Sequence, residues 1–148
     1  MLSDPSATCL VTAGGGARIA VRHMTLKAPG GFGLVAAGGV INGGDLWFDT
    51  MGNAAIDVCG PRSEFTAIGP LTWLFREFVA GVTVEDHGQA NLGCELIISG
   101  APNFAGAFAQ ADLGGMIDAT NARVTPALAT GRRFAAYSLG IAGSGAHI

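Results

Sequence analysis

Four acidic residues recur at short, fixed distances before glycines, and carboxylates with that spacing could do chemistry. Asp57 and Glu85 each stand three residues before a glycine, and Asp86 and Asp112 each stand two residues before one. If these glycines occupy equivalent places on adjacent turns of a repeating strand structure, each pair of carboxylates lies roughly 5 Å apart. That separation suits a retaining glycosidase, and paired carboxylates also bind cations. The four residues are therefore candidates for contact with a glycan or an ion, and solvated surface acids are the simpler alternative.

The other residue patterns favour neither catalysis nor a cofactor. His23, His87 and His147 are far apart and form no paired-histidine motif for a metal. The glycine runs lack the Lys-Ser/Thr of a phosphate-binding loop, and the chain has no Gly-x-Ser-x-Gly sequence around a nucleophile. The three cysteines are widely spaced and odd in number, as expected for small buried hydrophobic residues rather than disulfides. We expect a protein with no metal, no cofactor and no catalytic residue.

A repeat of short segments must position the four acidic side chains. Glycine supplies 24 of the 148 residues and charged residues only 13%, against usual values of about 7% and about 25%, which argues against a helix bundle. Runs of small and aliphatic residues end at glycines spaced 22 to 28 residues apart, and most are followed by a second segment with strand-like alternation. The six glycines are Gly14, Gly38, Gly60, Gly88, Gly114 and Gly140.

A unit of strand, glycine corner, strand and loop predicts one all-β domain over residues 1–148, a short parallel β-solenoid of about six turns. Stacking the turns would pair each strand with its equivalents above and below, and glycine suits a sharp corner because it adopts positive φ without penalty. A β-sandwich with glycine-rich turns is the alternative. Because both ends of such a stack are open, we expect residues 1–13 to form an N-terminal turn used for attachment. We also expect a homo-oligomer, most simply a parallel trimer.

An aromatic insertion at residues 67–81 interrupts the repeat. It contains Trp73, Phe75 and Phe78, with Arg76 among them. A short helix or an extra strand would fit this segment. Its side chains either complete the core or form an interface, since Trp, Phe and Arg are common in binding hot spots.

Charge and hydropathy exclude two classes of partner. A net charge of −3 gives no basic surface for nucleic acid. The sequence has neither a run of 18 apolar residues nor a signal peptide, so we expect no membrane insertion and synthesis in the cytoplasm of a cell.

Residues 96–145 resemble the distal β-helical region of tail-fibre-like proteins from bacteriophages and prophages. The matching features are the run SGAPNFAGAFA at 99–109, a glycine-led turn around Gly115, and ATGRRFA at 129–135 before a last glycine-rich turn. The resemblance implies a trimeric virion component, made in the bacterial cytoplasm, that contacts other virion proteins and binds host surface polysaccharide or supports a part that does. The resemblance implies no catalytic residue, because the matching motif contains none. We expect a tail-fibre-like or spike-like appendage for host attachment; the alternatives are a capsid or tail decoration protein and a polysaccharide-degrading enzyme of the tailspike type.

Overall fold

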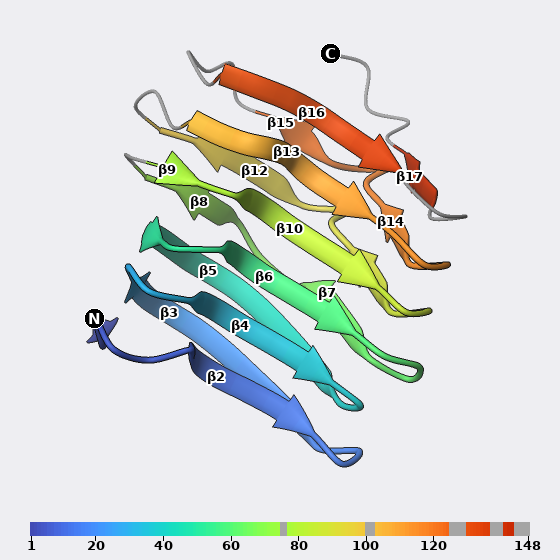
Figure 1. Cartoon of the computed structure of the whole chain (residues 1–148), viewed down its shortest axis with the longest axis horizontal. Coiled ribbons are helices and arrows are strands. Elements are labelled where there is room, and N and C mark those ends of the chain that lie inside the picture. Colours follow the sequence, from blue (N-terminus) through green and yellow to red (C-terminus); the bar gives the residue numbers. More distant parts are fainter. Residues whose placement is uncertain (75–76, 100–102, 125–129, 137–140, 144–148) are drawn as a thin grey trace.

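The chain folds as a parallel β-solenoid. The computed structural model describes residues 1–74, 77–99, 103–124, 130–136 and 141–143, and every regular element in these ranges is a strand. The strands stack into about five turns, and every strand pair joins strands that run parallel (Figure 1). This confirms the predicted all-β solenoid and removes the β-sandwich alternative, which would need antiparallel neighbours. None of the described segments is a helix long and apolar enough to cross a membrane.

Two sheets enclose the core, and one of them, sheet B, has its main strands stacked one above another (Figure 1). In stacking order from the N-terminal end, its main strands are β2 (Cys9–Gly14), β4 (Phe32–Ala37), β6 (Ala54–Cys59), β10 (Ala80–Glu85), β13 (Asn103–Ala111) and β16 (Thr130–Ala136). The short β9 (Glu77–Phe78) pairs with β13. Residues 9–13, which the sequence assigned to an N-terminal turn, lie in β2 at the first edge of this sheet.

Sheet A forms the other side of each turn and is bent at a corner. Its strands are β1 (Leu2–Ser3), β3 (Arg18–Ala28), β5 (Val40–Met51), β7 (Glu64–Ala67), β8 (Leu71–Trp73), β11 (Gln89–Asn91), β12 (Glu95–Ile98), β14 (Met116–Asp118), β15 (Arg123–Val124) and β17 (Ile141–Gly143). The long β3 and β5 run through the corner, where His23 and Asp45 both have a φ of 53°. On later turns the strand divides there, as β7 and β8 do.

The core consists of columns of apolar side chains that rise through the stack. In sheet B the register aligns Val11, Leu34, Ile56, Val82 and Ala109 on successive turns. The last four have no exposed surface, and the first is partly buried. Because burying one aliphatic side chain stabilises by about 1.5–3 kcal/mol, each added turn supplies apolar surface that the turn below buries.

Three predicted corner glycines have the expected backbone conformation. The φ angles of Gly38, Gly60 and Gly114 are 79°, 87° and 79°, in the left-handed region that L-residues with a side chain rarely adopt. The sixth predicted corner, Gly140, lies outside the described residues.

Gly14 and Gly88 also lie at corners, but neither has a positive φ. At the first corner the positive φ falls on the two glycines after Gly14, and at the fourth it falls on Asp86 and His87, at 48° and 65°. Glycine is needed at position 88 because there is no room for a side chain: a Cβ there would lie 2.8 Å from the backbone oxygen of Val58 on the turn below.

Candidate functional site: a groove on the outer face of sheet B

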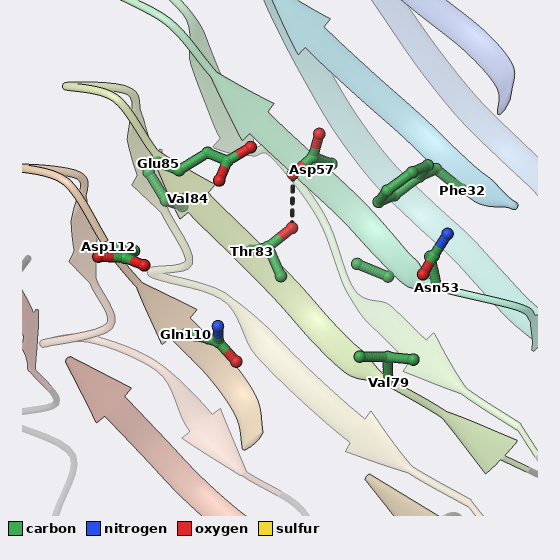
Figure 2. Close-up of a pocket in the computed structure, with 10 residues that line it drawn as sticks. Phe32, Asn53, Asp57, Val79, Thr83, Val84, Glu85, Gln110 and Asp112 are labelled. Carbon is green, nitrogen blue, oxygen red and sulfur yellow. Dashed lines mark hydrogen bonds between the residues drawn. The ribbon is translucent and has the colours of Figure 1, made fainter. Parts of the chain in front are cut away.

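A shallow groove of about 200 Å³ crosses the outer face of sheet B (Figure 2). It runs along the stack, since its walls come from β4, β6, β10 and β13 and from residues that directly precede or follow these strands. The lining residues are Phe32, Asn53, Ala54, Asp57, Val79, Thr83, Val84, Glu85, Gln110 and Asp112. Glu85 and Asp112 lie at the carboxyl ends of their strands. Phe32, Asn53 and Val79 lie toward the other end, and Asp57, Thr83 and Gln110 lie between the two groups.

Strand alternation directs Asp57 into the groove. Its neighbours Ile56 and Val58 have no exposed surface and belong to the core, so the side chain between them points to the opposite face. Asp57 is only 8% exposed, and the hydroxyl of Thr83 on the next turn donates a hydrogen bond of 2.6 Å to its Oδ1 (Figure 2). The register explains this contact, since Thr83 and Asp57 are direct partners across β6 and β10.

Burial raises the pKa values of two groove carboxyls, and repulsion by neighbouring acids adds to the shift of one of them, Glu85. Burial raises the pKa of Asp57 above its ordinary value, and hydrogen bonds from Thr83 and Cys59 oppose part of that effect. Burial also raises the pKa of Glu85, with smaller contributions from the negative charges of Asp57, Asp112 and Asp86 in that order. A hydrogen-bond donor or a cation entering the groove would relieve this repulsion.

Both carboxylate pairs predicted from the sequence have the wrong register. Asp57 lies opposite Thr83, and Glu85 lies opposite Cys59, so the Cα atoms of Asp57 and Glu85 are diagonal neighbours roughly 8 Å apart. The predicted spacing of about 5 Å therefore does not hold for this pair.

Asp86 does not face Asp112 either. Its corner position matches Leu113 on the next turn, where the backbone has nearly the same φ, 48° against 46°. The amide of Asp112 donates to the carbonyl of Val84 at 2.9 Å, which places Asp112 beside Glu85. Three of the four predicted acids therefore meet in one groove, and Asp86 is not among the residues that line it.

The error for Asp57 and Glu85 came from corner length, and the error for Asp86 and Asp112 came from aligning Gly88 with Gly114 instead of Gly115. Four residues, 60–63, join β6 to β7, whereas three residues, 86–88, join β10 to β11. Ser63, not Gly60, thus occupies the place of Gly88, and its hydroxyl donates to the Cys59 carbonyl at 2.5 Å and accepts from the Gly38 amide at 2.7 Å. Aligning strand residues rather than glycines would have found the groove and the unpredicted Thr83.

The groove offers hydrogen-bond acceptors and apolar surface. Carboxylate and amide oxygens can accept hydrogen bonds from hydroxyl groups, and Phe32 and Val79 supply apolar surface. No group of three or more His, Cys, Asp or Glu side chains in the described ranges is arranged to hold a metal ion. At about 200 Å³ the groove is below the 300–1,000 Å³ usual for small-molecule pockets, so it suits part of a longer ligand.

Two aromatic residues of the insertion, Trp73 and Phe78, lie in the interior. Trp73, at the end of β8, has no exposed surface, and Phe78 in β9 is 1% exposed. The ring of Trp73 packs on Phe48 and Phe108 with centroid distances of 5.3 and 4.8 Å. Within one chain these side chains complete the core and offer no surface to a partner. The other two interface candidates, Phe75 and Arg76, lie outside the described residues.

Comparison of the chain with protein-family models, with curated proteins and with solved structures found no match.

Proposed function

We propose that this protein is a non-enzymatic structural component of the virion of a tailed phage or phage-like particle. It acts as a tail-fibre-like or spike-like appendage for host attachment, forms a trimer, and contacts other virion proteins. The observation that carries the proposal is the short parallel solenoid with a groove along its axis on sheet B. The likeness of residues 96–145 to tail-fibre-like proteins supports the same function.

The groove is the proposed contact for host surface polysaccharide. A sugar chain lying along the solenoid axis would meet successive turns about 4.8 Å apart. Its hydroxyl groups would donate to the carboxylates of Asp57, Glu85 and Asp112, and the apolar faces of its rings would pack on Phe32 and Val79. Such a ligand is longer than the groove, so only part of the sugar chain would lie in it.

Two measurements test the proposal. The molar mass of the purified protein in solution should be close to three times the 14.9 kDa of one chain, and a stable monomer would contradict the proposed trimer.

Binding to host surface polysaccharide should weaken about tenfold in an Asp112→Ala variant, because a charge-assisted hydrogen bond contributes about 1.5–3 kcal/mol when buried and less at a surface. Asp118→Ala is the matched control, since Asp118 is an exposed acid in β14 of sheet A. Equal polysaccharide binding by the two variants would exclude the groove as the binding site.

A polysaccharide-degrading enzyme is the second candidate, and the adjacent Glu85 and Asp112 favour it. The pKa of Glu85 is raised, as suits a general acid, and a second carboxylate lies beside it. The enzyme predicts release of oligosaccharides from host polysaccharide and their loss in a Glu85→Gln variant that still binds. Binding without release by the unaltered protein would leave the attachment function alone.

A further inference from the structure

The first turn of the solenoid ends in an open sheet edge with positive charge. Strand β3 pairs with β5 on one side; on the other side, the described residues give it a partner only at Leu26 and Lys27, which pair with Leu2 and Ser3 of β1. The backbone from Arg18 to Thr25 therefore has one free edge, which can hydrogen bond to another strand.

The core is incompletely covered at this edge. Ile19 and Met24, which point inward from β3, are half-buried and pack against the core, whereas Ile41 and Leu46 directly above them have at most 1% exposed surface. A strand added below β3 would bury these side chains as the turns above bury theirs.

Charge on the first turn is opposite in sign to that of the turns above. Residues 1–28 carry three arginines or lysines and one acid, whereas residues 29–124 carry three arginines and ten acids. Two acids of the second turn lie beside basic side chains of the first turn. Lys27 Nζ lies 3.0 Å from Asp49 Oδ2, and His23 Nδ1 lies 3.5 Å from Asp45 Oδ2.

Among the residues that the structure describes, no acid pairs with two arginines on the free segment. Arg18 and Arg22 are exposed, and the residues opposite them in β5 are Val40 and Gly44. Four residues apart on one strand, they point to the same outer face, with the inward-facing Ile19 and Val21 between them. Their charges are available to a strand that pairs with the free edge.

We propose that this edge, Arg18–Thr25 of β3, binds an extended acidic segment of a partner protein as an added parallel strand. The register fixes the motif: acidic residues at positions i and i+4 face Arg18 and Arg22, and apolar residues at i+1 and i+3 face inward beside Ile19 and Val21. A second copy is disfavoured by charge. Two first turns would bring the same arginines together, and β17, the last described strand of sheet A, has no acidic residue to face them.

The test is a titration of the isotopically labelled full chain with the peptide Glu-Val-Thr-Val-Glu, blocked at both ends, followed by amide chemical shifts. We expect saturable shifts confined to residues 18–25 and to the adjoining part of β2. The peptide Val-Glu-Thr-Glu-Val has the same composition with its acids on the inward face, and it should give no saturable shift. Affinity should fall as ionic strength rises, because these charges are exposed.

Charge-reversal variants complete the test. The double variant Arg18→Glu, Arg22→Glu should bind the acidic peptide about tenfold more weakly and should bind Lys-Val-Thr-Val-Lys instead. Arg62→Glu, at an exposed arginine in another corner, should leave the affinity unchanged. Equal affinity of the double variant, equal binding of the two acidic peptides, or no saturable shift would overturn the proposal. Shifts of the edge amides that depend on protein concentration, without peptide, would assign the edge to a second copy and overturn it as well.

Discussion

The aromatic core around Trp73 gives the sharpest test of the fold, through the variant Trp73→Ala. The side chain is fully buried and its ring lies 5.3 Å from that of Phe48 and 4.8 Å from that of Phe108. Removing a buried tryptophan costs about 3–5 kcal/mol, and the two aromatic contacts, each worth about 0.5–1.5 kcal/mol, fall within that total. For a chain of this length the loss lowers the melting temperature by about 6–20 °C.

The variant Trp73→Phe separates packing from polarity. The indole Nε1 is buried, and no described residue accepts a hydrogen bond from it. An unsatisfied buried donor costs about 1–3 kcal/mol, so phenylalanine removes that cost while it gives up part of the ring contact. We expect a free energy of unfolding within about 1.5 kcal/mol of the unaltered protein.

Trp47→Ala is the matched control, because Trp47 is 39% exposed on the outer face of β5. Urea unfolding should give a loss of about 1.5 kcal/mol or less for this variant, and sedimentation should give the oligomeric state of all three. The reasoning fails if Trp73→Ala unfolds with nearly unchanged free energy but no longer oligomerises. That result would place the indole ring in an interface between chains.

Three further outcomes follow from single positions. Gly88→Ala should destabilise by about 1–3 kcal/mol in thermal unfolding, because its Cβ would meet backbone at 2.8 Å, whereas Gly93→Ala, which meets only side chains, should cost less than about 1 kcal/mol; equal losses would contradict the corner geometry. The raised pKa of Asp57 means that its ionised form destabilises the fold, an effect absent below the ordinary value of 3.8 and growing as pH rises through the raised pKa. Asp57→Asn, which still accepts from Thr83, should therefore gain stability relative to the unaltered protein at pH 7 but not at pH 3.5, and a constant difference between the two pH values would refute this. Partial burial raises the pKa of the Cys94 thiol to about 11. In a variant with no other cysteine it should therefore react with a thiol reagent at pH 8 about a hundredfold more slowly than a free thiol, and a comparable rate would mean that its pKa is not raised.

The sequence predicted the repeat well and the register poorly. Regularly spaced glycines predict corners because a sharp bend needs positive φ, and Gly38, Gly60 and Gly114 have it. The corner after β6 is one residue longer than the corner after β10, however, and that difference moves Glu85 from opposite Asp57 to opposite Cys59. A glycine marks a corner without fixing which of its residues stacks on which.

Composition and spacing alone determined that the chain coils into stacked parallel turns, since one turn of small and aliphatic residues cannot bury its own inner face. Only the tertiary structure decided which side chains become neighbours. Stacking brought Asp57, Glu85 and Asp112 into one groove, buried Trp73, and left Arg18 and Arg22 on an open edge. These contacts join residues about 25 positions apart, and they depend on strand register, which arises only when the turns pack together.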